Sequence, residues 1–270
     1  AFVFDGQVHT HAQYAARAPR LAAGLAAAGV GRGDRVAVVA QNRPEYLDLY
    51  AAAARLGAIV VPVNWRLSAE EMAHAVTDTT PKLLLADPEY QPALAALRGR
   101  SPGLSGLYGY GGTAEGFTPY EALLQAGDEP PAAEAAADDG YVIIHTAAVG
   151  GLPRGALLSH AGLLAAGMQL INRWQLGPDD VNLGMLPLFH VSGLGQFLAT
   201  LQAGGCTLLA QRFDPKAAAR QIAEHRVTVF AEFAPMLGAI LDAAQAEGTD
   251  LSSLRAVSGL DTPDTIARFQ

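Results

Sequence analysis

The sequence has one cysteine, Cys206, and only two lysines, Lys82 and Lys216. A single cysteine excludes a disulfide framework and a cysteine-based zinc site, so a reducing cytoplasm is the expected location. The net charge of −8 argues against a nucleic-acid partner, because such a protein needs a basic face to displace counterions from phosphates. No run of eighteen apolar residues lacks a charge or a breaker, and the start AFVFDGQVHT has no basic region before a long apolar run. Neither a transmembrane segment nor a signal peptide is therefore expected.

Half of the residues are hydrophobic and only 16% are charged, which provides ample material for a core and excludes a disordered chain. Short apolar runs alternate with helical patterns of ten to fifteen residues, and this alternation predicts parallel sheets wrapped on both faces. We expect an α/β fold of doubly wound, mixed or parallel sheets flanked by helices, in two similar subdomains. Strands are predicted at 35–40, 59–64, 81–87, 141–146, 180–188, 206–211, 227–233 and 254–259, and helices at 44–58, 159–174, 191–204 and 234–248, with others beginning at Pro215 and Pro263. Local signals predict a capping box from Ser68 to Glu71, a helix end at Gly57 and an N-cap at Asp214.

Composition divides the chain into three portions. Residues 1–98 form a first α/β portion, 99–140 form a crossover or linker rich in Gly, Pro and acidic residues, and 141–270 form a second α/β portion. AFVF resembles the middle of a strand and TIARFQ ends inside a helical pattern. Both ends of the sequence are therefore expected to be cut.

The loop TAAVGGLPRG, residues 146–155, is the strongest candidate for chemistry. It follows a predicted strand and is expected to precede a helix, whose free amides and positive dipole end would attract an anion. Gly150 and Gly151 permit close approach of a phosphate, and Arg154 offers a bidentate charge. The alternative is an ordinary glycine turn. The sequence contains no Walker A loop and no GxSxG nucleophile elbow, and the spaced glycines at 29–33 follow a helix, the wrong order for a dinucleotide turn.

Several segments in order carry a family resemblance: GRGDRVAVVAQNRPEYLDLYAAAARLGAIVVPVNWRL, TAAVGGLPRGALLSH, LPLFHVSG, FDPKAAARQIAEHRVTVFAEFAPML and LSSLRAVSG. Together they resemble the amino-terminal part of the adenylate-forming, AMP-binding superfamily of acyl-CoA synthetases, adenylation domains and luciferases. The resemblance implies that a carboxylate attacks the α-phosphate of Mg-ATP to form an acyl-adenylate and pyrophosphate. A thiol, usually that of coenzyme A, then displaces AMP.

The resemblance also implies site residues. The phosphate-binding loop would comprise Thr146, Ala147, Ala148, Val149, Gly150, Gly151 and Arg154. Here the family's Ser-Gly-Thr-Thr-Gly has become Ala147 to Gly151, which removes hydroxyl groups, and the lysine of its Pro-Lys-Gly has become Arg154, which keeps the charge. His190 would be the catalytic residue beside the acyl and adenylate groups. The adenylate and acyl pocket would contain Phe233, Ala234, Ser258, Gly259 and Leu260, for which plain core packing is the alternative.

The favoured function is that of an acyl-CoA synthetase acting on a fatty or other hydrophobic acid, with ATP, Mg²⁺ and coenzyme A. The glutamate that holds Mg²⁺ is expected beyond this chain, together with the family's catalytic-lysine domain, and no metal ligand is assigned within it. We therefore expect the chain to be a fragment that is inactive alone. A non-catalytic nucleotide- or acyl-binding protein and an unrelated doubly wound enzyme using the Gly150–Arg154 loop remain alternatives, and a homodimer remains open.

Overall fold

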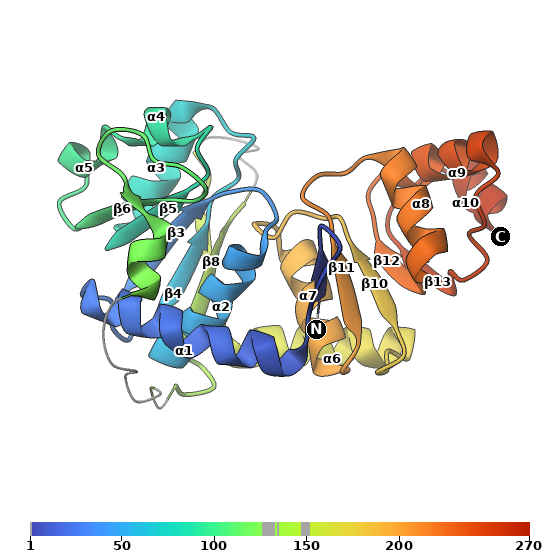
Figure 1. Ribbon diagram of the computed structural model, residues 1–270, viewed down its shortest axis with the longest axis horizontal. Helices are drawn as coiled ribbons and strands as arrows, with labels where there is room; N and C mark the ends of the chain where they lie inside the picture. The colour runs from blue at the N-terminus through green and yellow to red at the C-terminus, as the bar shows by residue number, and fades with distance from the viewer. Residues whose placement is uncertain (1, 126–132, 134, 147–151) are drawn as a thin grey trace. The chain divides into compact units, whose positions relative to one another are not determined.

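Helices and mostly parallel strands alternate along the chain in the computed structural model, which describes residues 2–125, 133, 135–146 and 152–270 (Figure 1). The chain folds into two compact units, one made of Ala1–Thr10 and Leu164–Gln270 and the other of His11–Leu163. Each unit has its own sheet with flanking helices, which confirms the predicted fold class. These two units are defined by how the chain packs. The portions 1–98, 99–140 and 141–270 are defined by sequence composition and stay a prediction.

The described strands of His11–Leu163 form one sheet in the order β7-β6-β5-β3-β4-β8-β9. All neighbours are parallel except β8 and β9, which are antiparallel. The strands are β3 (Arg35–Val39), β4 (Ile59–Pro62), β5 (Leu83–Ala86), β6 (Gly106–Gly109), β7 (Thr118–Pro119), β8 (Gly140–His145) and β9 (Gly155–Ser159). The helices are α1 (His11–Ala27), α2 (Pro44–Leu56), α3 (Ala69–Thr79), α4 (Gln91–Leu94), α5 (Leu97–Arg100) and the 3₁₀ helix η1 (Tyr120–Leu124).

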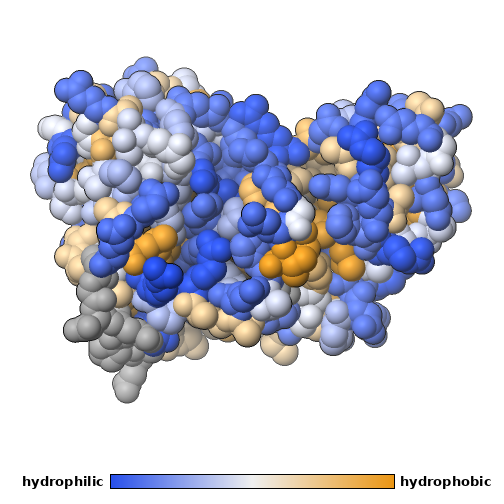
Figure 2. Space-filling model, viewed as in Figure 1, coloured by the Kyte–Doolittle hydropathy of each residue, from blue (hydrophilic) through white to orange (hydrophobic). Residues whose placement is uncertain are grey.

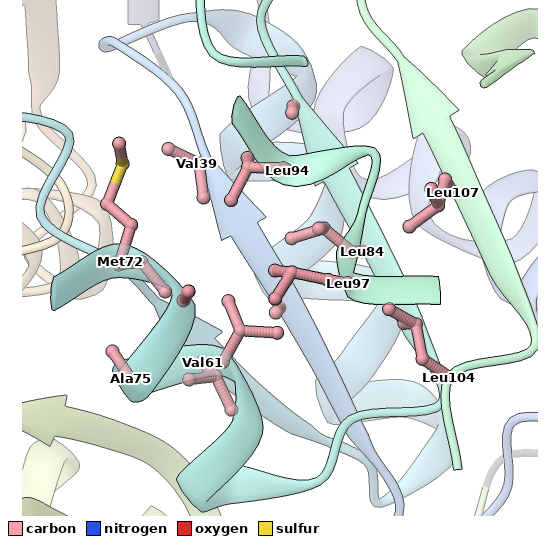
Figure 3. Close-up of a cluster of buried hydrophobic side chains, with 14 of the residues drawn as sticks. Val39, Val61, Met72, Ala75, Leu84, Leu94, Leu97, Leu104 and Leu107 are labelled. Carbon is pink, nitrogen blue, oxygen red and sulfur yellow. The ribbon is translucent and has the colours of Figure 1, made fainter. Parts of the chain in front are cut away.

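The alternating side chains of these strands build the core of this unit. Val39, Val61 and Leu84 point from the sheet toward α3, α4 and α5 and are fully buried among their apolar side chains (Figure 3). Local signals set the helix ends. The Ser68 hydroxyl accepts from the Glu71 N–H while the Glu71 carboxylate accepts from the Ser68 N–H, which is a capping box. Gly57 ends α2 in the left-handed region, where glycine carries no Cβ penalty.

The described strands of the other unit form a sheet in the order β13-β12-β10-β11-β1-β2, parallel except at β1–β2. The strands are β1 (Phe2–Phe4), β2 (Gln7–His9), β10 (Val181–Gly184), β11 (Cys206–Leu209), β12 (Val229–Ala231) and β13 (Ala256–Ser258). The helices are α7 (Val191–Gln202), α8 (Pro215–His225), α9 (Met236–Glu247) and α10 (Pro263–Phe269), while α6 (His160–Trp174) begins in the first unit and continues in this one.

Helices cover both faces of this second sheet. Phe230 of β12 packs toward α8 and α9, whereas its neighbour Val229 packs toward Trp174 of α6 and Ala199 of α7. The connection after β10 runs through α7 to β11 on one side, and the connection after β12 runs through α9 to β13 on the other. The carboxyl ends of β10 and β12 therefore flank a topological switch point, the place where open α/β sheets bind ligands.

The surface gives no sign of a membrane-spanning element. In the parts of the chain that the structure describes, every helix is too short or too polar to cross a bilayer. On the face drawn in Figure 2, hydrophilic residues cover most of the surface and strongly apolar residues gather only in small groups. Scattered apolar groups of this size are ordinary on a protein surface.

Candidate active site

One pocket of about 310 Å³ lies at the switch point of the second sheet. It is formed where the chain leaves β10, β12 and β13, and α6 closes one side. Its walls are mostly apolar, with a few polar groups, which is the usual composition of a small-molecule site. The lining residues are Leu170, Trp174, Leu186, Ser192, Gln196, Ala231, Glu232, Phe233, Ser258, Gly259 and Leu260.

The structure brings most of the predicted pocket residues together here. Phe233, Ser258, Gly259 and Leu260 all line the cavity. Ala234 does not line it, but its N–H donates to the carbonyl of Leu260 at 2.8 Å and so joins the two strand ends. Their roles toward a ligand stay a prediction, since position alone assigns none.

His190 lies at the N-terminus of α7, next to this pocket. It is the N-cap of the helix, and its Nδ1 accepts from the N–H of Ser192 at 3.2 Å and pairs with the Ser192 hydroxyl at 3.0 Å. The imidazole also meets the ring of Phe233 edge to face, with the centroids 5.9 Å apart. His190 is therefore linked both to the pocket wall and to the first turn of α7.

This geometry selects the tautomer of the neutral His190 ring. Because Nδ1 accepts a backbone N–H, the proton of the neutral ring must sit on Nε2. Desolvation lowers the pKa of His190 below its usual value, which favours the neutral ring. Nε2–H is thus a donor that can point at an oxygen of a ligand carboxylate or phosphate.

The predicted phosphate loop lies in the other unit. Thr146 and Arg154 face each other across the end of the β8–β9 hairpin, where the Thr146 N–H donates to the Arg154 carbonyl at 3.0 Å. Both residues are exposed, while Ala147, Ala148, Val149, Gly150 and Gly151 lie outside the described residues.

The expectation that this loop leads directly into a helix is wrong. Residues Gly155–Ser159 form strand β9, which pairs antiparallel with β8, and α6 begins only at His160. The positive end of the α6 dipole is therefore not placed at the loop. Among the described residues of the loop, Arg154 supplies a positive charge for an anion.

Sequence reasoning missed Glu232, the most unusual residue of the pocket. Glu232 is only 2% exposed, yet its carboxylate oxygen Oε2 has no hydrogen-bond partner among the described residues. Burial, and then the nearby Asp261 carboxylate, raise the pKa of Glu232 above its ordinary value. The available signal was an acidic residue inside the apolar run TVFAEFAPML, where strand β12 ends.

The described residues contain no group of three or more His, Cys, Asp or Glu side chains placed to hold a metal ion.

Comparisons with known proteins agree with the fold. The family model described as AMP-binding enzyme matches residues 1–269. A feruloyl-CoA synthase from Amycolatopsis is 35% identical over 97% of this chain and 51% of its own length. A crystal structure from Rhodopseudomonas palustris CGA009, of a provisionally assigned long-chain-fatty-acid CoA ligase, matches with a TM-score of 0.92 and 50% identity over all of this chain and 67% of that one. ATP-bound MatB from Rhodopseudomonas palustris matches with a TM-score of 0.86 and 27% identity over all of this chain and 54% of that one.

The chain spans about half the length of the curated relatives it matches. The family model nevertheless covers almost every residue of the chain, and the relatives align across both compact units. The chain belongs to the family of AMP-binding enzymes.

Proposed function

We propose that this chain is the acid- and phosphate-binding part of an acid–thiol ligase, which activates a hydrophobic carboxylic acid with ATP and transfers it to coenzyme A. The observation that carries the proposal is the pocket at the β10–β12 switch point, with apolar walls and His190 at its edge. Family membership supports the nucleotide, because the matching model is that of AMP-binding enzymes.

The chemistry requires positioning and charge neutralisation. An oxygen of the acid attacks the α-phosphorus of ATP, a new O–P bond forms, and the bond to the leaving pyrophosphate breaks. Little covalent work falls to the protein in such a transfer. In this proposal Nε2–H of His190 orients an oxygen of the acid, and the exposed guanidinium of Arg154 neutralises phosphate charge. The sulfur of a thiol then attacks the acyl carbon, and AMP departs with the electron pair of the broken C–O bond.

The walls of the pocket indicate the kind of acid. Leu170, Trp174, Leu186 and Phe233 surround it with aliphatic and aromatic surface, which favours an acid with an apolar body. Relatives are named for ferulate and for long-chain fatty acids, and both acids have such a body. The site therefore fits a hydrophobic acid, and a cytoplasmic protein would meet both ATP and coenzyme A.

Binding of a bisubstrate probe tests the proposal on the chain itself. Calorimetry would compare decanoate, AMP and a decanoyl sulfamoyl adenosine, which joins the acid and nucleotide parts in one molecule. If the two parts occupy adjacent sites, the conjugate should bind at least tenfold more tightly than either part. His190→Ala should reduce this advantage. Ser253→Ala serves as the control, because Ser253 precedes β13 and does not line the pocket. A conjugate that binds no better than decanoate would refute a common adenylation site.

We also expect the 270-residue chain to support no substantial carboxylate-dependent pyrophosphate exchange. The glutamate for Mg²⁺ and the catalytic lysine of the family are not among its assigned residues, so ligand binding would remain while turnover would not. Exchange of radiolabelled pyrophosphate into ATP measures this directly. Rapid exchange by the chain would show that its own residues complete the reaction.

A further inference from the structure

Glu232 places a carboxylate in an otherwise apolar part of the pocket. The residue follows β12, its N–H donates to the Ser258 carbonyl at 2.9 Å, and its side chain lines the cavity while only 2% of the residue is exposed. The backbone N–H of Leu237 is near enough to the carboxylate to oppose part of the rise in its pKa. A buried carboxylate needs several donors, because each unpaired oxygen carries the full desolvation penalty.

The neighbouring polar groups of the pocket do not supply these donors. The amide nitrogen of Gln196 donates to Asn182 at 3.1 Å, and the hydroxyl of Ser192 pairs with His190. Oε2 of Glu232 is consequently without a partner among the described residues. Because Glu232 also lines a cavity of about 310 Å³, a bound molecule that displaces the few atoms covering Oε2 would supply the missing donor.

The opposite side of the carboxylate is closed by the backbone of Gly259. A Cβ on Gly259 would collide with Oε1 and with the backbone carbonyl oxygen of Glu232. Glycine at 259 therefore lets the carboxylate approach the chain where it leaves β13. Small residues of this kind fix the position of a side chain by leaving it just enough room.

Charge determines which part of a ligand can reach Glu232. The Asp261 carboxylate is near enough to disfavour a second negative charge, and its Oδ2 is also buried without a partner among the described residues. The carboxylate of an acid substrate would be repelled from this corner and would favour the Nε2–H donor of His190. The corner suits a group that donates a proton in a hydrogen bond.

We propose that Glu232 selects hydrophobic acids whose carbon skeleton carries one hydrogen-bond donor, a hydroxyl or an amino group, remote from the reacting carboxylate. This inference rests on the proposed function and deepens it by naming the substrate class. The donor hydrogen-bonds to Oε2 while the apolar body of the acid fills the space between Trp174, Leu186 and Phe233. A plain fatty acid of the same length leaves the buried oxygen unpaired and binds less well.

Matched acids test the proposal by calorimetry on the purified chain. The probes are hexanoate, octanoate, decanoate and phenylpropanoate, their ω- or para-hydroxy and amino derivatives, and the corresponding methyl ethers, which accept but cannot donate. At least one donor-bearing acid should bind about ten- to a hundredfold more tightly than its parent and its ether, the range for a hydrogen bond to a charged group.

Three variants separate specificity from folding. Glu232→Leu should abolish the preference, and Glu232→Gln should retain it for a hydroxyl, because the amide oxygen still accepts, but lose it for an ammonium group. Asp261→Asn removes a nearby charge that does not line the pocket and should keep the preference. Thermal unfolding of each variant confirms that it is folded, and the Gln variant serves if the Leu variant is not.

The outcomes distinguish this inference from the proposed function. If plain acids bind and no donor-bearing acid binds more tightly than its parent, the selection by Glu232 is refuted while the acid pocket stands. A preference that survives Glu232→Leu assigns the donor to another residue and also refutes it. If no acid binds in any arm, both the selection and the proposed function fail.

Discussion

Gly193→Ala should disturb the turn that carries His190, although the change adds only one methyl group. Gly193 lies in the first turn of α7, where the helix passes over the chain leaving β10. A Cβ at this position would lie 2.7 Å from the carbonyl oxygen of Leu186 and nearer still to that of Pro187. These are backbone atoms, which cannot rotate away, and the Pro187 carbonyl also accepts the N–H of His190 at 3.0 Å.

Gly195→Ala provides the matched control, two residues further along the same helix. A Cβ there meets nothing within 4 Å, so the substitution should stabilise the fold by about 0.5–1 kcal/mol through the helix propensity of alanine. Gly193→Ala gains the same amount but adds overpacking, which costs about 1–3 kcal/mol. The two variants should therefore differ in free energy of unfolding by about 1–3 kcal/mol, since the propensity gain cancels.

Urea unfolding of both variants measures this difference, and calorimetry with decanoate measures its effect on the site. We expect Gly193→Ala to unfold at lower urea and to bind the acid more weakly, while Gly195→Ala retains wild-type affinity. Equal stability of the two variants would refute the close approach of α7 to the 186–187 carbonyls. Reduced stability with unchanged acid affinity would show that the His190 turn does not shape the pocket.

Three further predictions concern charged or titratable side chains. Arg154→Ala should weaken ATP binding at least tenfold without lowering the melting temperature, because Arg154 is exposed. An unchanged dissociation constant for ATP in calorimetry would favour the alternative of an ordinary glycine turn. The ring protons of His190 should titrate in NMR spectra below about 6.5, and a midpoint at or above that value would contradict a neutral ring held by the Ser192 N–H. Burial raises the pKa of Asp48 to about 6 although Arg17 donates to it at 2.9 Å, so the folded state binds the proton more tightly and wild-type stability falls as pH rises from about 4 to 6. Asp48→Asn should gain about 2 kcal/mol on wild type between pH 4 and pH 7, and urea unfolding with an equal difference at both pH values would contradict this.

Local signals in the sequence predicted the elements that depend on local chemistry. The capping box at Ser68 and Glu71, the Asp214 cap of α8 and the glycine end of α2 at Gly57 are all confirmed. Each rests on contacts within one turn of the chain. Such contacts are visible in sequence because distant residues do not alter them.

Short strands were the main failure of the prediction. Gly106–Gly109 and Gly155–Ser159 have too few residues for a period-two pattern to stand out, and each becomes a strand because a neighbour pairs with it. The strand β9 matters most, since its presence converts the predicted loop-to-helix turn into a hairpin. The Thr146–Arg154 pair and the absence of a helix dipole both follow from that non-local pairing.

The candidate site was predictable only in part for the same reason. The family resemblance named Phe233 and residues 258–260, which lie at the ends of the predicted strands 227–233 and 254–259. The carboxyl ends of parallel strands meet at one edge of a sheet, so these residues come together. Sequence reasoning missed Glu232 because an acidic residue ordinarily lies in solvent. Its burial depends on the close approach of Gly259, which follows another strand and is distant in sequence.

The construction of the pocket explains why family membership leaves the substrate open. Three short segments after β10, β12 and β13 supply most of its wall, while the sheet and its helices are held by separate apolar clusters. A change at the end of a strand can therefore alter the pocket without disturbing the core. Relatives named for ferulate and for long-chain fatty acids align with this chain at 35% and 33% identity, so overall similarity hardly separates them. The buried carboxylate of Glu232 is a feature of the wall itself, and for that reason the choice of acid is best tested there.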